Sequence, residues 1–279
     1  MRSAYLPRSI EGMDLPVSVN GATARQVAER CAAAACATIR DGFGRASLAG
    51  VKGRGNVVTD TDFAAEKATM EILHAEFPGH AILSEETSAA TRSDGWLWVI
   101  DPLDGTKNFS RAIPHFGYNI ALYFESRPVL GITSHPLLGD TYLAIEGEGC
   151  FHNGRRIQVS EVTTLSDAVV ALDMGYDAPR GGRQLELAAH LWPGMQSLRI
   201  TGSAALGFAY VAAAKWDIYV HSDLQPWDIA PGLILVREAG GEVLDRTGAP
   251  ASLFSREAVA AARPVLDDFF ARARGVPWQ

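Results

Sequence analysis

The hydrophobic pattern of the chain is organised around residues 96–109. Five apolar residues run directly into a polar turn: Trp96-Leu97-Trp98-Val99-Ile100, then Asp101-Pro102-Leu103-Asp104-Gly105-Thr106. A continuous apolar run of this length is typical of a strand buried on both faces. Pro102 cannot donate to a ladder and Gly105 permits unusual dihedral angles, so we expect the strand to stop and turn at Asp101. The pattern therefore predicts two carboxylates held close together at the rim of a rigid element.

The same kind of pattern predicts the other elements. Helical spacing of apolar residues indicates helices over residues 21–42, 63–74, 183–191, 202–215, 229–239 and 262–274. Apolar or alternating runs indicate strands over 81–86, 96–101, 116–132, 141–145, 168–172, 197–200, 216–220 and 242–245. Glycines punctuate antiparallel turns up to about residue 155, whereas strands and helices alternate afterwards. We expect an N-terminal α+β lobe with an antiparallel sheet over residues 1–160 and a C-terminal α/β lobe over 161–279.

Polar residues lie at the ends of several of these elements. Asp60 or Asp62 suits the N-cap of the helix over 63–74, and Asp228 suits the N-cap of the helix over 229–239, with Pro231 in its first turn. Glu85 and Glu86 end a strand, where acids are most often solvated. Gly202-Ser203-Ala204-Ala205 opens a helix, and small residues there serve either anion binding or close packing. The sequence alone leaves both interpretations open.

Residues 43–56 contain four glycines together with Lys52 and Arg54. This composition predicts either a mobile basic loop or a floppy connection without a function of its own.

Composition and charge narrow the class of protein. The 279 residues carry a net charge of −7, with 47% hydrophobic and 20% charged residues, as in ordinary globular proteins. This charge disfavours a nucleic-acid-binding surface. Cys31, Cys36 and Cys150 have no metal-binding or disulfide spacing, so we expect free thiols in a reducing compartment. No segment has the pattern of a signal peptide or a membrane span, and we expect a cytoplasmic protein without a membrane partner.

Five sequence blocks together resemble the inositol monophosphatase family of magnesium-dependent, lithium-sensitive phosphatases. The blocks follow the family's order and are Val58-Thr59-Asp60-Thr61-Asp62, Ser84-Glu85-Glu86, Trp98 to Phe109, Gly202-Ser203-Ala204-Ala205, and Trp227-Asp228-Ile229-Ala230-Pro231-Gly232 with Glu238-Ala239-Gly240-Gly241. One such block is a weak signal, whereas five in order over residues 55–245 are highly specific. The resemblance implies a sugar-phosphatase fold, an αβαβα layered sandwich with the active site between the lobes.

The resemblance also implies roles for individual residues. Glu85, Asp101 and the carbonyl of Leu103 would hold one Mg²⁺, and Asp101, Asp104 and Asp228 a second. Glu85 and the Thr106 hydroxyl would orient the attacking water, with Asp62 accepting a hydrogen bond from Thr106. The amides of Gly105 and Thr106 would bind the phosphate, and Asp104, Gly202, Ser203, Ala204 and His221 would lie against the substrate. A third, weaker metal ion is often seen in relatives, Mn²⁺ would be able to replace Mg²⁺, and relatives are usually homodimers.

This residue set also suits the chemistry of phosphate ester hydrolysis. The uncatalysed reaction is very slow, so a catalyst must position water and neutralise negative charge. Two cations about 3.5–4 Å apart do both. Mg²⁺ prefers oxygen ligands, which the acids provide without a nearby Cys/His cluster.

Two positions depart from the family pattern. His221 stands where inositol phosphatases carry a glutamate for the ring hydroxyls, and an imidazole cannot accept two hydrogen bonds from a diol. Ser84 replaces the more usual glycine before the glutamate pair. We expect a phosphomonoesterase acting on a small phosphorylated metabolite, first of all inositol 1-phosphate. Histidinol-phosphatase, fructose 1,6-bisphosphatase and 3′-phosphoadenosine nucleotidase activities remain alternatives, as does a non-catalytic regulatory protein on this fold.

Overall fold

The computed structural model of the chain describes residues 15–53, 56–87 and 95–276. Its helices are α1 (Ala24–Gly42), α2 (Asp60–Glu76), α3 (Thr106–Ser110), α4 (Ala178–Leu191), α5 (Ala204–Ala212), α6 (Pro226–Glu238), α7 (Arg263–Arg272) and the 3-10 helix η1 (Leu165–Asp167). Its strands are β1 (Leu48–Gly53), β2 (Asn56–Thr59), β3 (Ala81–Ser84), β4 (Trp96–Asp104), β5 (Gly117–Phe124), β6 (Arg127–His135), β7 (Asp140–Ile145), β8 (Gly149–His152), β9 (Arg155–Ile157), β10 (Val169–Asp173), β11 (Ser197–Arg199), β12 (Ile218–His221), β13 (Glu242–Leu244) and β14 (Ala258–Ala261).

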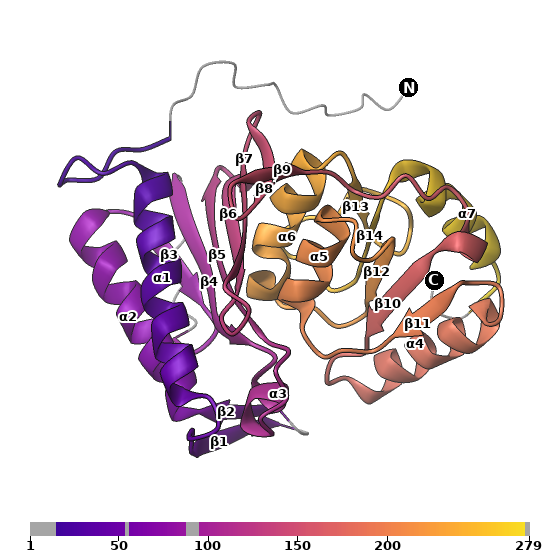
Figure 1. Cartoon of the computed structure of the whole chain (residues 1–279), viewed down its shortest axis with the longest axis horizontal. Coiled ribbons are helices and arrows are strands. Elements are labelled where there is room, and N and C mark those ends of the chain that lie inside the picture. The colour runs from indigo at the N-terminus through magenta and orange to yellow at the C-terminus, as the bar shows by residue number, and fades with distance from the viewer. Residues whose placement is uncertain (1–14, 54–55, 88–94, 277–279) are drawn as a thin grey trace.

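These elements stack as five layers, helix on sheet on helix on sheet on helix (Figure 1). The layered αβαβα sandwich expected from the sequence is confirmed. The first sheet has the order β3-β4-β5-β6-β7-β8-β9, and every neighbouring pair is antiparallel except β3 and β4. The second has the order β11-β10-β12-β14-β13, with β10 parallel to both of its neighbours. We propose the halves that carry the two sheets as the lobes expected over 1–160 and 161–279.

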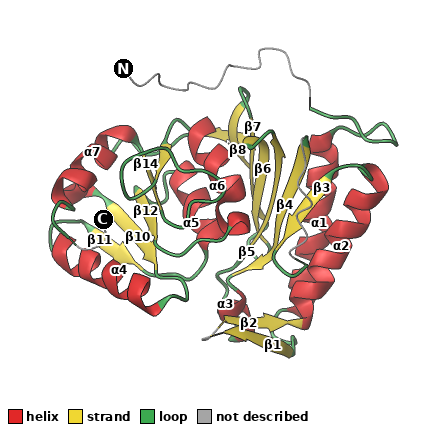
Figure 2. Cartoon of the chain, turned by 180° about the vertical axis from the view of Figure 1, so that it is seen from behind, coloured by secondary structure: helices red, strands yellow, loops and turns green. Residues whose placement is uncertain are grey.

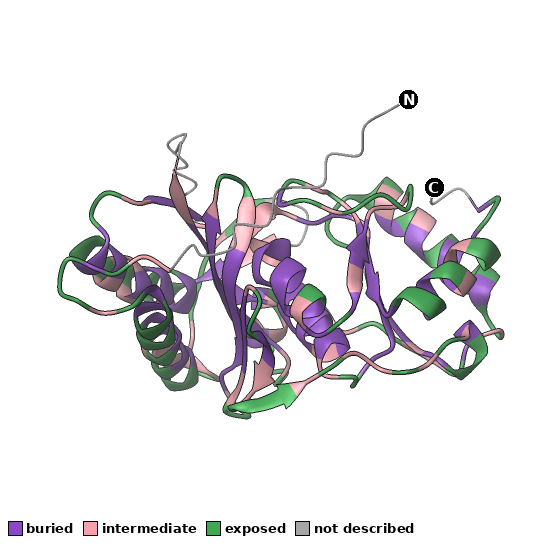
Figure 3. Cartoon of the chain, turned by 90° about the horizontal axis from the view of Figure 1, so that it is seen from above, coloured by how far each residue is buried: buried purple, intermediate pink, exposed green. Residues whose placement is uncertain are grey.

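Helices α5 and α6 form the central layer and contact both sheets. Helix α6 is buried without interruption from Ile229 to Val236, which is the pattern of a helix enclosed on all sides. Figure 3 shows this central layer almost wholly buried, whereas the outer helices present exposed faces. Gly131 in β6 makes the close contact possible, because a Cβ there would lie 2.6 Å from the Ile234 side chain.

The outer helices cover the remaining sheet faces. Helices α1 and α2 pack against the first sheet, and α4 and α7 pack against the second (Figure 1). Cys31, Cys36 and Cys150 are buried free thiols, as expected. Among the described residues, none of the helices combines the length and apolar character needed to cross a membrane.

The prediction that the central strand stops at Asp101 is wrong. Strand β4 continues to Asp104, with a register shift against β5 between Asp101 and Asp104. Pro102 lies within this shifted stretch, where the regular ladder is interrupted, so its missing N–H is tolerated.

The described part of residues 43–56 contains strand segments and is not simply a loose connection. Strands β1 and β2 pair antiparallel as a hairpin that lies beside α3 (Figure 2). Residues 54–55, which include Arg54, lie outside the described residues. The hairpin carries Lys52 to the acids described below.

Two helix starts differ from the expected ones. Thr59, rather than Asp60 or Asp62, is the N-cap of α2, and Gln225, rather than Asp228, is the N-cap of α6. Asp62 and Asp228 each occupy the third helical position and accept a hydrogen bond from the backbone N–H of the cap residue. Local sequence cannot distinguish the two positions, because an acid is favourable at both.

Two further features differ from the expectations. Strand β14 was not predicted. Pro231 lies beyond the first turn of α6, whereas it was expected within that turn.

Candidate active site

Asp104 ends β4 and points at the N-terminus of α5. Its carboxylate accepts hydrogen bonds from the backbone N–H groups of Ala204 (3.2 Å) and Ala205 (3.0 Å), and also from the Ser203 hydroxyl. These contacts satisfy free N–H groups at the start of a helix and place a negative charge where the helix dipole favours it. The helix thereby fixes the position of the carboxylate.

Asp228 is held through the start of α6. Its Oδ2 accepts from the Gln225 N–H at 2.7 Å. Pro231 has no N–H for the Trp227 carbonyl four residues earlier, and Asn119 Nδ2 in β5 donates to that carbonyl at 3.2 Å instead. Asn119 thus links the first turn of α6 to the first sheet, close to Asp101, which lies opposite Asn119 on the neighbouring strand. The sequence offered no signal for this role of Asn119.

Asp101, Asp104 and Asp228 converge. One carboxylate oxygen from each lies within 4.8 Å of the others, and no other group of this kind occurs among the residues that the structure describes. Burial, together with repulsion between neighbouring acids, raises the pKa of Asp101 and Asp228 well above the usual range. Burial also raises the pKa of Asp104 to about 6. A divalent cation relieves this repulsion, and three carboxylates form an oxygen donor set of the type that Mg²⁺ prefers. We call Asp101, Asp104 and Asp228 the three-acid group.

Glu85 lies near the three-acid group without belonging to it. Its Oε1 is 3.0 Å from Lys52 Nζ, and Lys52 also contacts Glu86 at 2.6 Å. Burial raises the pKa of Glu85 to about 7, although the Lys52 ammonium opposes this effect. The hairpin thus brings an internal cation to the acid that was expected to bind the first metal ion.

Thr106, which lines the cavity with the three-acid group, contacts Asp62. The Thr106 hydroxyl lies 2.9 Å from Asp62 Oδ1 and 2.9 Å from the carbonyl of Leu103. Asp62 is buried, and desolvation raises its pKa. Its second oxygen caps the start of α2 through Thr59 N at 2.9 Å, so the backbone of one helix orients the carboxylate that faces Thr106.

The predicted residues surround one cavity of about 610 Å³. Its lining includes Glu85, Asp101, Leu103, Asp104, Gly105, Thr106, Gly202, Ser203, Ala204, His221 and Asp228, and also Lys52. Asp62 reaches this cavity only through its contact with Thr106. A cavity of this size suits a small-molecule ligand.

Gly105 forms the sharp turn below the acids. Its φ is +87° and a Cβ would lie 3.0 Å from the Gly202 carbonyl, so only glycine fits without strain. The turn leads directly into α3, where the first N–H groups of a helix have no helical partner. Gly202 N already donates to Asp173 Oδ1 at 2.6 Å, and Ser203 and Ala204 donate to Asp104. The polar groups of these three residues therefore position acids in this structure.

His221 ends β12 and is 6% exposed. Its Nδ1 accepts from the Asp223 backbone N–H at 3.1 Å. Burial lowers the pKa of His221, which favours the neutral ring. Because Nδ1 is an acceptor, the neutral ring carries its proton on Nε2. His221 thus has a hydrogen-bond donor to offer, where a glutamate would have acceptors.

Sequence reasoning missed three residues of the cavity wall. Asp173 accepts from the N–H groups of Thr201 (2.9 Å) and Gly202. Asp223 accepts from the N–H groups of Tyr176 and Asp177, both at 3.1 Å. Tyr176 presents its ring to the cavity with Lys107 Nζ 4.7 Å from the ring centroid. No motif marks these residues, because segments far apart in the chain place them together.

Known proteins similar to this chain in sequence and in fold point to one family. A sequence profile of the inositol monophosphatase family matches residues 22–276. Inositol monophosphatase 3 of Solanum lycopersicum is 35% identical over 258 residues, covering 88% of this chain and 94% of the relative. Nus factor SuhB of Escherichia coli K12 is 37% identical over 199 residues, covering 71% and 74%. The solved structure of the Thermotoga maritima IMPase is 31% identical, with a TM-score of 0.83 and coverage of 90% and 97%. The chain therefore belongs to the inositol monophosphatase family.

Proposed function

We propose that the protein is a Mg²⁺-dependent phosphomonoesterase that hydrolyses a small polyol phosphate, inositol 1-phosphate first of all. The observation that carries this proposal is the three-acid group, in which Asp101 and Asp104 are buried and Asp228 is partly buried, and whose carboxylates face a cavity beside the turn of Gly105 and Thr106. Carboxylates held this close together away from water repel one another, so their convergence supports a cation-binding role. The resemblance described from the sequence supports two cations, with Glu85 and the Leu103 carbonyl completing the set.

Each candidate residue would have its own role in the proposed reaction. Asp101, Asp104 and Asp228 would hold one cation, and Asp101 would also help to hold a second, together with Glu85 and the carbonyl of Leu103. When bound, such cations neutralise charge on the phosphate and activate water. The Thr106 hydroxyl, fixed by Asp62, would orient the attacking water together with Glu85. The N–H groups of Gly105 and Thr106 would donate to the phosphate.

The alcohol half of the substrate would face the wall formed by the second sheet. His221 would donate one hydrogen bond from Nε2 to an oxygen of this alcohol, whereas Gly202, Ser203 and Ala204 would contact the substrate beside Asp104. A single donor recognises a ring diol less completely than a carboxylate does. Histidinol phosphate, fructose 1,6-bisphosphate and 3′-phosphoadenosine nucleotides therefore remain alternative substrates.

A regulatory role is the second candidate, because one relative at 37% identity is named a Nus factor. The presence of all the candidate ligands favours turnover, since a protein that only binds partners has no need to keep buried acids together. On the family resemblance we also propose a homodimer, sensitivity to lithium, and a cytoplasmic location.

A phosphate-release assay tests the proposal. The purified chain is incubated with Mg²⁺ and a panel containing inositol 1-phosphate and the three alternative substrates. We expect metal-dependent release of phosphate from at least one of them, abolished by EDTA and restored by Mg²⁺ or Mn²⁺. No release from any member of a broad panel of phosphorylated metabolites would favour the regulatory role.

A further inference from the structure

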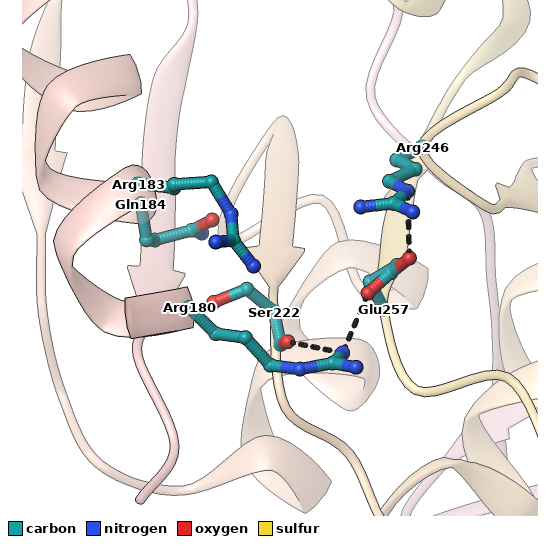
Figure 4. Close-up of a pocket in the computed structure, with 6 residues that line it drawn as sticks. All are labelled: Arg180, Arg183, Gln184, Ser222, Arg246 and Glu257. Atoms are coloured by element: carbon teal, nitrogen blue, oxygen red, sulfur yellow. Dashed lines mark hydrogen bonds and ion pairs between the residues drawn. The ribbon is translucent and has the colours of Figure 1, made fainter. Parts of the chain in front are cut away.

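A second, smaller pocket lies between α4, the end of β12 and the segment before β14. Its lining consists of Arg180, Arg183, Gln184, Ser222, Arg246 and Glu257 (Figure 4). We call it the arginine pocket. It shares no lining residue with the larger cavity.

The arginine pocket has an excess of positive charge. Glu257 is its one carboxylate and bridges two arginines, with Oε2 2.8 Å from Arg180 Nη1 and Oε1 2.9 Å from Arg246 Nε (Figure 4). Arg183 has no hydrogen bond or ion pair with any residue that the structure describes. Three guanidinium groups thus face one carboxylate in a chain whose net charge is −7.

Two buried polar atoms of the pocket also lack a partner among the described residues. They are Gln184 Oε1 and Ser222 Oγ. Gln184 is fully buried, and its Nε2 donates to the Val220 carbonyl at 3.1 Å. This bond fixes the orientation of the amide, because a flipped amide would set two carbonyl oxygens against each other. A buried polar atom without a partner is costly, and its presence indicates a missing water or ligand.

These groups define the chemistry of a ligand. Arg183 and the Ser222 hydroxyl donate hydrogen bonds and need acceptor oxygens, whereas Gln184 Oε1 accepts and needs an O–H. Hydrogen phosphate offers both, since it keeps an O–H at neutral pH. Sulfate offers only acceptors. We propose that the arginine pocket binds a protonated oxyanion of the phosphate type.

The geometry also specifies how such an anion enters. The free space in the pocket measures about 10 Å³, which holds one water molecule. For an anion to reach Gln184 and Ser222, Arg183 would turn outward and then close over it, and the guanidinium would lose no hydrogen bond or ion pair with the described residues in this movement. Ser222 lies between His221 and Asp223, both of which line the larger cavity. The bound anion would thus contact the back of the wall that faces the substrate.

Calorimetric titration of the full chain with inorganic phosphate in EDTA tests the proposal. Without divalent cations the three-acid group repels phosphate, so binding does not depend on the proposed reaction, and the Arg183 variant assigns it to the arginine pocket. We expect one site per chain. Arg183→Gln should weaken it about tenfold or more, because a charge-assisted bidentate contact is lost. Arg25→Gln is the matched control, since Arg25 pairs with Glu29 on the surface of α1. Absence of phosphate binding, or equal binding by both variants, would overturn the proposal.

A second comparison tests the role of the acceptor. Wild-type protein should bind phosphate more tightly than sulfate, and Gln184→Met should remove this preference while sulfate binding is retained. If Gln184→Met unfolds, the affinities of the wild-type protein for phosphate and sulfate still test the role of Gln184 Oε1. Equal affinities for the two anions would contradict that role. Crystals soaked in phosphate that show only a water between Gln184 and Ser222 would also refute the site.

Discussion

Thr106 and Asp62, which are 44 residues apart in sequence, share a buried contact of 2.9 Å beneath the acids of the cavity. The contact is specific in direction, because a carboxylate without a proton can only accept and the Thr106 hydroxyl must donate. The hydroxyl oxygen keeps its lone pairs free for a further partner. This is the arrangement required of a residue that accepts a hydrogen bond from an attacking water.

Replacing Thr106 with valine tests this role. Valine keeps the shape and removes the hydroxyl, so we expect phosphate release to fall about 10²–10³-fold, within the range of general acid–base contributions. The melting temperature should also fall, because the buried Asp62 Oδ1 loses its hydrogen-bond donor, although Asp62 Oδ2 keeps its contacts with Thr59, so the assay is run well below the melting temperature of the variant. Asp62→Asn should lower both activity and stability, since it also disturbs the cap of α2. Normal turnover in Thr106→Val would show that the Thr106 hydroxyl has no role in catalysis.

Asp101→Asn tests the three-acid group. Asp101 is the acid expected to contact both cations, and we expect its loss to reduce turnover by about a thousandfold or more. Phosphate release measured against Mg²⁺ concentration provides the readout. Asp41→Asn is the control, because the Asp41 side chain, near the end of α1, is 84% exposed and pairs with the exposed Arg45. Similar rates for the two variants would contradict the proposed metal site.

Lys52→Met tests whether the internal cation competes with metal ions for Glu85. The ammonium lies 3.0 Å from Glu85 and is 30% exposed. Because such partly exposed pairs contribute about 0.5–1 kcal/mol, we expect divalent ions to bind about two- to fivefold more tightly in the variant. Mn²⁺ titration measures the effect, and Lys67→Met, on the surface of α2, serves as the control. Weaker Mn²⁺ binding in Lys52→Met would show that the lysine assists the metal.

Asp223→Asn should give a pH-dependent loss of stability. Burial tends to raise the pKa of Asp223, but the hydrogen bonds from Arg256 and from the Asp177 and Tyr176 N–H groups outweigh it, and the net shift is downward. A lowered pKa means that the carboxylate stabilises the fold above its unfolded pKa of about 4, and that this contribution is lost as the pH falls through the lower, folded pKa.

We therefore expect the variant to lose about 1–3 kcal/mol of unfolding free energy at neutral pH. The difference from the wild-type protein should shrink as the pH falls below about 4. Urea unfolding across this range is the measurement, with Asp267→Asn on α7 as the exposed control. A difference that does not vary with pH would mean that the charge of Asp223 is not involved.

His221→Glu should alter substrate preference. The change replaces one donor with two acceptor oxygens, so kcat/KM for inositol 1-phosphate should rise relative to the other substrates of the panel. The dependence on Mg²⁺ should stay the same, because His221 is outside the three-acid group. An unchanged substrate profile would place the alcohol elsewhere in the cavity.

Much of the fold was predictable from local pattern. The apolar run before Asp101 predicted a buried central strand, and β4 is buried from Trp98 onward. The end of this strand was predicted wrongly, because Pro102 suggested a stop where the chain instead shifts its register against β5. Strand β14 was missed because Ala258–Ala261 is a short run without a distinctive period, and its pairing with β12 and β13 is what makes it a strand.

The sequence by itself determined which residues could perform chemistry: acids in a fixed order, each at the start or the end of an apolar segment, with glycine where the chain must turn. Only the tertiary structure decided what those residues contact. Asp104 meets the start of α5, Asn119 replaces the N–H that Pro231 lacks, and Lys52 reaches Glu85. The physical reason is that a hydrogen bond or an ion pair acts over a few ångströms. The partners of such a bond are therefore set by sheet register and helix packing, which bring distant segments together. They cannot be predicted from the neighbouring sequence.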